Sequence, residues 1–133
     1  MGKLVIPERD ILAACLNRLW WWKSQGVVVH YERRTVRTWT DGRNIKLAES
    51  GTPDITTYVK HNGICSICFF EVKRSNVNIT LGPKGHQLAF MLRFKDLTNV
   101  YYDLINHPSM VDQRIENITN HTDTIFNNMN LDV

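Results

Sequence analysis

Asp54 and Glu71 are the two residues of this chain whose types and spacing best suit catalytic chemistry. Between them lies Asn62-Gly63, flanked by β-rich runs, and this dipeptide is the strongest short-range signal for a two-residue hairpin turn. If these residues form the turn, His61 faces Ile64, and counting outward along both strands pairs Asp54 with Glu71. Facing residues share one face of a sheet, with their Cβ atoms about 4.5–5.5 Å apart. The sequence therefore predicts two carboxylates side by side.

Two opposed carboxylates need a positive partner, because like charges that face each other destabilise a sheet. A divalent metal ion is the natural candidate, since hard cations bind carboxylate oxygens. Lys73 follows Glu71 by two residues and therefore lies on the same face, about 6.7 Å further along the strand. Asp54, Glu71 and Lys73 together predict a site for metal-assisted hydrolysis.

The residue pattern before this hairpin predicts one helix and one strand. Pro7 suits the first position of a helix, apolar residues then recur at helical spacing, and Gly26 ends the element. Residues 27–31 form a short β-rich run, which predicts the first strand. Residues 32–50 are polar and basic, and they predict a long connection of the kind that is usually functional or mobile.

The chain after the hairpin predicts a second helix, a last strand and a final helix. The second helix is expected to begin at Pro83. Its buried side is expected to carry Leu88, Met91, Leu92 and Phe94. Residues 98–105 predict the last strand, and His107-Pro108 predicts the start of the final helix.

This order predicts an α/β sandwich with a mixed sheet. Short connections make the first three strands an antiparallel meander, and the second helix is a crossover of the right length to bring the fourth strand parallel to the third. A chain of 133 residues is expected to form one domain. Residues 1–106 would form its core, and residues 107–133 would form a C-terminal helical extension.

Three motifs resemble the PD-(D/E)XK nuclease superfamily. They are Gly51-Thr-Pro-Asp54, Phe70-Glu71-Val-Lys73 and Gln87 in the next helix. Within the superfamily the chain looks most like the VRR-NUC type, which includes stand-alone viral and phage proteins similar to Holliday-junction resolvases. The resemblance covers roughly residues 5–105 and implies a restriction-endonuclease-like αβββαβ core, with a mixed sheet flanked by helices. The entry to the second helix departs from the family pattern, because it has an extra residue or two before Gln87.

The resemblance also implies a role for each site residue. Asp54, Glu71 and the backbone carbonyl of Val72 would hold Mg²⁺ or Mn²⁺, and Lys73 would orient the attacking water. Glu8 would be a further acid near the metal, or else only a partner for the dipole of the first helix. Gln87 would donate a hydrogen bond beside these residues, or else be a surface glutamine.

The implied activity is that of a divalent-metal-dependent endonuclease, which hydrolyses phosphodiester bonds of DNA and needs no organic cofactor. Branched DNA such as a Holliday junction is the expected substrate. The alternatives are a restriction- or repair-type nuclease on linear or flap DNA, and a non-cleaving nucleic-acid-binding protein with the same fold.

Basic residues flank the predicted site in the sequence and suit contacts with phosphates. Those expected to bind nucleic acid are Arg33, Arg34, Arg37, Arg43, Lys46, Arg74 and Lys84. Taken singly, each also fits a solvated surface charge. The net charge of +3 is compatible with a polyanionic partner without requiring one.

Two further patterns bear on a partner, and we expect a homodimer. The consecutive Trp20, Trp21 and Trp22 cannot all face one core, so at least one is expected to be partly exposed, where it would stack on a base, lie in an interface or cap the core. In the last helix, apolar residues follow a heptad spacing, which fits either docking on the same domain or pairing with a second copy. These residues are Val111, Ile115, Ile118, Thr122, Ile125 and Met129.

Composition places the chain among cytoplasmic proteins, in a bacterium or a phage-infected host cell. Three cysteines are an odd set, which argues against a disulfide framework, and we expect Cys65 and Cys68 to be core thiols. No apolar run approaches the roughly 20 residues that span a bilayer. The first residues lack the features of a signal peptide.

Overall fold

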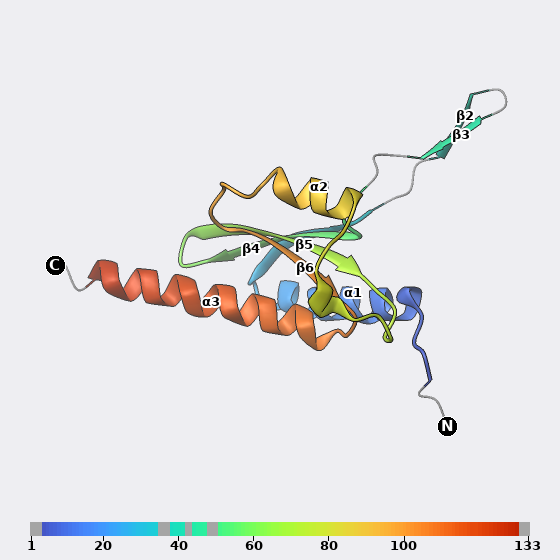
Figure 1. Cartoon of the computed structure of the whole chain (residues 1–133). Helices are drawn as coiled ribbons and strands as arrows, with labels where there is room; N and C mark the ends of the chain where they lie inside the picture. The colour runs from blue at the N-terminus through green and yellow to red at the C-terminus, as the bar shows by residue number, and fades with distance from the viewer. Residues whose placement is uncertain (1–3, 35–37, 42–43, 48–50, 131–133) are drawn as a thin grey trace.

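A computed structural model of the chain describes residues 4–34, 38–41, 44–47 and 51–130. Its centre is a four-stranded mixed sheet with helices on both faces (Figure 1). The sheet contains β1 (Val28–Arg33), β4 (Ile55–His61), β5 (Ile64–Val72) and β6 (Val100–Ile105). The helices are α1 (Glu8–Ser24), α2 (His86–Leu92) and α3 (Ser109–Asn130), with a short 3-10 turn η1 (Ile79–Leu81). A separate two-stranded ribbon contains β2 (Thr38–Asp41) and β3 (Asn44–Leu47).

The order of the strands in the sheet confirms the predicted mixed topology. The order is β1-β4-β5-β6, in which β1, β4 and β5 are antiparallel neighbours and β6 runs parallel to β5. A crossover that contains η1 and α2 joins the two parallel strands. The structure thus has the α/β architecture that the sequence predicted.

The hairpin of β4 and β5 has the predicted register. His61 pairs with Ile64, and Ile55 pairs with Phe70 at the other end. The turn residues Asn62 and Gly63 have φ angles of 53° and 76°, and a positive φ at both positions is what a type I′ hairpin turn requires. The local dipeptide therefore sets which residues of the two strands face each other.

The two faces of the sheet are covered by different helices. In Figure 1, α1 and α3 lie against one face, and α2 lies over the other. Ile55, Val59 and Phe70 are fully buried on the α1/α3 face. They pack with residues of both helices, among them Ile11, Cys15, Leu19, Val111, Ile115 and Ile118. The main core thus lies between the sheet and these two helices. The side chains on the α2 face of the sheet do not belong to this core.

The heptad seam of α3 docks on its own domain. Val111, Ile115, Ile118 and Thr122 are buried, whereas Met129 is exposed. The sequence allowed this seam either to dock on its own domain or to pair with a second copy. The first four seam positions dock on their own domain. Only the last turns of α3 present apolar side chains to solvent.

The second helix is shorter than predicted and faces the sheet differently. It begins at His86 rather than at Pro83, because Gly82 and Gly85 have φ angles of 76° and 57°, which no helical residue adopts. The predicted buried side is partly wrong, since Leu88 and Leu92 are exposed. The residues that pack on the sheet are Phe90 and Phe94, whose rings lie 5.2 and 5.0 Å from that of Phe69.

Two other predictions need correction. The predicted long connection 32–50 contains the end of β1 and the antiparallel ribbon of β2 and β3, in which Thr38 pairs with Leu47 and Asp41 with Asn44. Cys68 is buried, but Cys65 is exposed, because residues three apart on a strand point to opposite faces.

The three consecutive tryptophans lie in different environments. Trp20 and Trp21 are exposed, as the crowding argument predicted, and Trp22 instead donates a hydrogen bond to Asp112 of α3 (2.7 Å). In the part of the chain that the structure describes, no helix is long and apolar enough to cross a membrane.

Candidate active site

Three charged side chains form a row across three strands on the α2 face of the sheet. Arg33 pairs with Ile55 in the β1–β4 ladder, and just beyond it the N–H of Arg34 donates to the carbonyl of Asp54 (2.7 Å). Continuing the β4–β5 register by one residue puts Asp54 beside Glu71. The row therefore runs Arg34, Asp54, Glu71, and the two acids meet as the sequence predicted.

The carboxylate of Asp54 is held on two sides. Its Oδ2 accepts a hydrogen bond from the backbone N–H of Val72 (2.8 Å), and its Oδ1 accepts one from Nη2 of Arg34 (3.2 Å). The guanidinium of Arg34 also donates to the carbonyl of Thr52. These bonds fix the carboxylate in one orientation at the end of β4.

Glu71 lies in a different environment from Asp54. Its side chain is only 7% exposed, and its Oε2 is buried without a hydrogen-bond partner among the described residues. The pKa of Glu71 is raised to about 7, chiefly by burial and then by the charge of the neighbouring Asp54 and a hydrogen bond with it. Lys73 and Arg34 act in the opposite direction. The cations already present thus offset only part of the cost of placing two carboxylates together.

A pocket of about 530 Å³ opens beside Glu71. It is lined by Arg34, Gly51, Thr52, Glu71, Lys84, Gly85, His86 and Gln87. An adjoining hollow of about 190 Å³ is lined in part by Lys73, Lys84 and Gln87. The structure therefore brings the predicted Glu71, Lys84 and Gln87 to one pocket and places Lys73 at the next. Two cations and one acid at a single opening suit an anionic ligand.

Gly51 explains how the start of α2 is held against this pocket. Its φ angle is +82°, and a Cβ at this position would lie 2.3 Å from the carbonyl oxygen of His86. Only glycine allows the two backbones to approach so closely. Because Gln87 follows His86 directly, this contact keeps Gln87 at the pocket that Glu71 lines.

Glu8 lies at the beginning of α1, as the first-turn acid that the sequence predicted. Two hydrogen bonds join the segment before α1 to the segment after β5: the N–H of Ile6 donates to Oγ of Ser75 (2.8 Å), and the N–H of Ser75 donates to the carbonyl of Ile6 (3.0 Å). They bring the start of α1 to the end of β5 that carries Glu71. Glu8 is exposed and lines neither pocket, so its role at a metal stays a prediction.

The other predicted basic residues are less closely associated with the acids. Arg33 and Arg74 are exposed, each next to a residue of the site. Strand alternation turns Arg33 to the opposite face from Arg34. Lys46 belongs to β3, in the separate ribbon. Arg37 and Arg43 lie outside the described residues.

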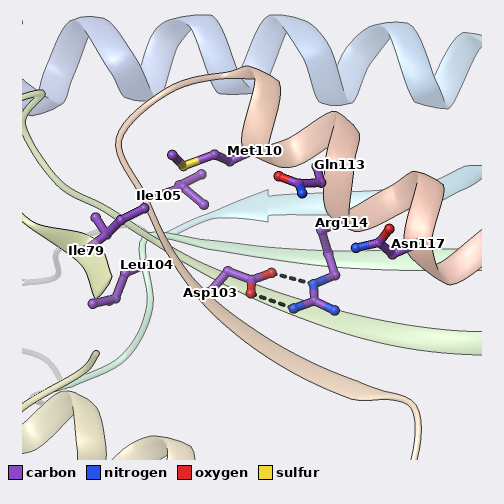
Figure 2. A pocket seen from close by; sticks show the side chains of 8 residues that line it. All are labelled: Ile79, Asp103, Leu104, Ile105, Met110, Gln113, Arg114 and Asn117. Carbon is purple, nitrogen blue, oxygen red and sulfur yellow. Dashed lines mark hydrogen bonds and ion pairs between the residues drawn. The ribbon is translucent and has the colours of Figure 1, made fainter. Parts of the chain in front are cut away.

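A further hollow, of about 270 Å³, lies between β6 and α3 (Figure 2). Asp103 and Arg114 face each other in it, and the guanidinium donates two hydrogen bonds of 2.6 and 2.7 Å to the carboxylate. Because these two groups already bind each other, a ligand that bound to either of them would have to break this ion pair.

Sequence reasoning found the acids but missed two of their neighbours. Arg34 was predicted as a phosphate contact, which stays a prediction, and its ion pair with Asp54 was not foreseen. The pairing of Arg34 with Asp54 depends on the β1–β4 register, which shifts between Val28 and His30. Residues 34–54 separate β1 from β4 in the chain, so no short turn sets this register. Tyr102, whose buried hydroxyl lies on the same face of the sheet, carried no sequence signal that would have singled it out.

The donor set fits a divalent cation of the hard, oxygen-binding kind. Glu71 has a buried oxygen without a hydrogen-bond partner among the described residues. The carboxylate of Asp54, the second acid of the site, lies close enough to affect the pKa of Glu71. Within the described residues there is no cluster of three or more histidine, cysteine or acidic side chains that could hold a metal. A cation here would therefore depend on two carboxylates, completed by a backbone carbonyl and water. Mg²⁺ commonly keeps several waters and takes only one or two protein carboxylates.

No protein-family model matches the chain, and comparisons with curated proteins and with solved structures also find no match.

Proposed function

We propose that this protein is a divalent-metal-dependent endonuclease of the PD-(D/E)XK type that hydrolyses phosphodiester bonds of DNA. One observation carries the proposal: Asp54 and Glu71 meet across the β4–β5 hairpin at a basic pocket, and Glu71 keeps a buried oxygen without a partner. A protein that only binds DNA gains nothing from two opposed carboxylates, because they repel phosphate and each other. A site that holds Mg²⁺ or Mn²⁺ needs them.

The bound cation would polarise the scissile phosphate and lower the pKa of a water molecule. Asp54 and Glu71 would hold it, together with the carbonyl of Val72. The hydrogen bonds from Arg34 and Val72 keep the Asp54 carboxylate in one orientation, which is the condition for an organised site. Glu71 would lose its proton when the cation binds, because the cation favours the charged form.

The other side chains of the pocket would act on the substrate. Lys84 and Arg34 would attract the negative phosphates to the opening, and Gln87 would donate a hydrogen bond there. Lys73 lies close enough to affect the pKa of Glu71, and it would orient the attacking water and stabilise developing charge. The roles of Lys73 and Gln87 rest on the resemblance to PD-(D/E)XK nucleases, and their places in and beside the pocket are compatible with them.

The substrate is proposed to be branched DNA such as a four-way junction, cut by a homodimer whose symmetry matches the two strands. This part rests on the resemblance to stand-alone VRR-NUC proteins. Cleavage of linear or flap DNA is the alternative within the same chemistry. Binding without cleavage is the alternative from a different class.

A cleavage assay separates these alternatives. Labelled four-way junction, flap and linear duplex would be incubated with the protein in Mg²⁺, in Mn²⁺ and in EDTA. We expect cleavage of the junction with either metal and none in EDTA. Asp54→Asn and Glu71→Gln should abolish cleavage while DNA binding remains. Asp96→Asn, which removes an exposed carboxylate elsewhere, is the matched control and should cleave normally.

Three results would contradict the proposal. Cleavage in EDTA would exclude the metal mechanism, and undiminished cleavage by Asp54→Asn would exclude the site. Tight junction binding by the wild-type protein with no cleavage in either metal would favour the binding protein. Preferential cleavage of flap or duplex would instead move the proposal to the repair-type substrate.

A further inference from the structure

Tyr102 of β6 is a neighbour of the two acids that the proposed function does not yet use. In the sheet, Phe69 pairs with Tyr102 and Glu71 pairs with Leu104. Residues two apart on a strand share a face, so Tyr102 and Glu71 lie on the same face, one step apart along the diagonal. Diagonal neighbours in a sheet are about 7–8 Å apart, within reach of an aromatic and a long side chain.

The ring of Tyr102 is held in place by other rings. Its centroid lies 6.4 Å from that of Phe69 and 6.2 Å from that of Phe90. These contacts fix the ring between the sheet and α2. The hydroxyl is therefore placed by packing, and it is buried without a hydrogen-bond partner among the described residues.

Two buried polar atoms without hydrogen-bond partners among the described residues thus belong to diagonal neighbours on the same face of the sheet. One is the hydroxyl of Tyr102, a donor, and the other is Oε2 of Glu71, an acceptor. Leaving either atom unsatisfied is unfavourable, because a buried polar group loses its hydrogen bonds to water, and proteins rarely leave two such atoms close together without a use. Burial and the charges of Glu71 and Asp54 also raise the pKa of Tyr102, so its hydroxyl keeps its proton at neutral pH and remains a donor.

We infer that Tyr102 is a positioning residue, whose hydroxyl donates a hydrogen bond through one water molecule to Glu71 and holds that carboxylate ready for the cation. A contact between polar groups that are too far apart for a direct bond is commonly bridged in this way. The inference rests on the proposed function, because it assigns Tyr102 to the neighbourhood of the same metal site. It adds a residue that neither the motifs nor the spacing of the sequence pointed to.

The test measures metal binding in the absence of DNA. Isothermal titration calorimetry with Mn²⁺ would compare the full-length wild-type chain with Tyr102→Phe, which removes the hydroxyl and keeps the ring. Tyr101→Phe is the matched control, since it removes a hydroxyl from the adjacent residue of β6, which lies on the opposite face over Arg114. We expect the Kd for Mn²⁺ to rise about tenfold in Tyr102→Phe, the lower end of the range for residues that orient metal ligands, and to be unchanged in Tyr101→Phe.

Thermal unfolding of the metal-free proteins separates positioning from folding. A purely structural role for the hydroxyl would lower the Tm of Tyr102→Phe, whereas we expect its Tm to be equal to or above that of the wild type. A Kd within twofold of the wild type, or a loss of binding that is accompanied by a lower Tm, would overturn the inference and leave the proposed function intact. If the wild-type chain binds no Mn²⁺ at all, the proposed function itself is overturned, and the inference with it.

Discussion

At the scale of single residues, the site contains two carboxylates that the structure treats differently. Asp54 receives hydrogen bonds from Arg34 and from the backbone of Val72, whereas Glu71 is buried with one oxygen unsatisfied. A buried acid whose pKa is strongly raised, beside a second carboxylate, is typical of functional sites. The difference between Asp54 and Glu71 leads to two predictions.

The first prediction concerns pH. The pKa of Glu71 is raised from its usual 4.5 to about 7 in the folded protein, so folding favours the protonated form. The stabilisation from this group is complete below about pH 4.5 and is lost as the pH rises through 7, by up to about 3 kcal/mol. Urea unfolding in EDTA at pH 5 and pH 8 should show this loss in the wild type. Glu71→Gln should show a smaller decrease, and equal decreases in both proteins would contradict the prediction.

The second prediction concerns the positive partner of Asp54. Arg34→Gln removes the charge beside Asp54, and we expect the free energy of unfolding to fall by about 1–2 kcal/mol, because a hydrogen bond to a charged group is lost. Cleavage should fall as well, since the carboxylate of Asp54 loses its orientation. Arg33→Gln, at the neighbouring exposed position on the opposite face, is the control. Equal effects of the two substitutions on unfolding and on cleavage would show that Arg34 is only a surface charge.

At the scale of elements, the site depends on how the segment before β4 meets the start of α2. Gly51 and His86 are in backbone contact, and the pocket that contains Gln87 and Lys84 is built on that contact. The motif Gly51-Thr-Pro-Asp54 therefore has a packing function at its first residue, and the proposed function assigns a chemical one to its last.

The third prediction separates these effects with two glycines that have nearly the same φ angle. Gly51 and Gly26 have φ angles of +82° and +80°, but a Cβ at Gly26 would meet nothing within 4 Å. Gly26→Ala should destabilise the fold by about 1–2 kcal/mol through backbone strain alone. Gly51→Ala should cost more and should also reduce cleavage, because His86 must move. If chemical unfolding gives equal losses for both variants, the close approach to His86 does not hold α2.

At the scale of the whole molecule, α3 belongs to the fold rather than forming an appendage. Its buried residues complete the core under β4 and α1, and Asp123 accepts hydrogen bonds from His61 (2.8 Å) and Asn62 (2.6 Å) at the hairpin turn. Removing residues 107–133 would therefore uncover the core. The oligomeric state has to be tested on the full chain.

The fourth prediction uses two apolar positions of α3. Ile115→Ala should lower the free energy of unfolding by about 2–5 kcal/mol, because it opens a cavity in the core, whereas Phe126→Ala at an exposed position should change it by less than about 0.5 kcal/mol. Sedimentation of the full-length Phe126→Glu variant tests whether the exposed end of α3 lies in the proposed homodimer interface. A mass reduced from dimer to monomer would place it there, and an unchanged dimer would exclude it.

Local sequence determined the parts of this protein that depend on a few adjacent residues. Asn62-Gly63 readily adopts the two positive φ angles that a tight type I′ turn requires, and this turn fixed the β4–β5 register and the meeting of Asp54 with Glu71. Strand alternation then fixed which side chains share a face. The mixed sheet followed from the lengths of the connections.

Only the tertiary structure decided the contacts between residues that are distant in the chain. The pairing of Arg34 with Asp54 depends on a β1–β4 register with an irregularity, and the docking of Gly51 on His86 depends on how α2 packs against the sheet. The burial of Glu71 and of the Tyr102 hydroxyl likewise depends on α2, which covers this face of the sheet, and on β6, which lies beside β5. Such contacts are set by the packing of whole elements, and no short stretch of sequence contains that information.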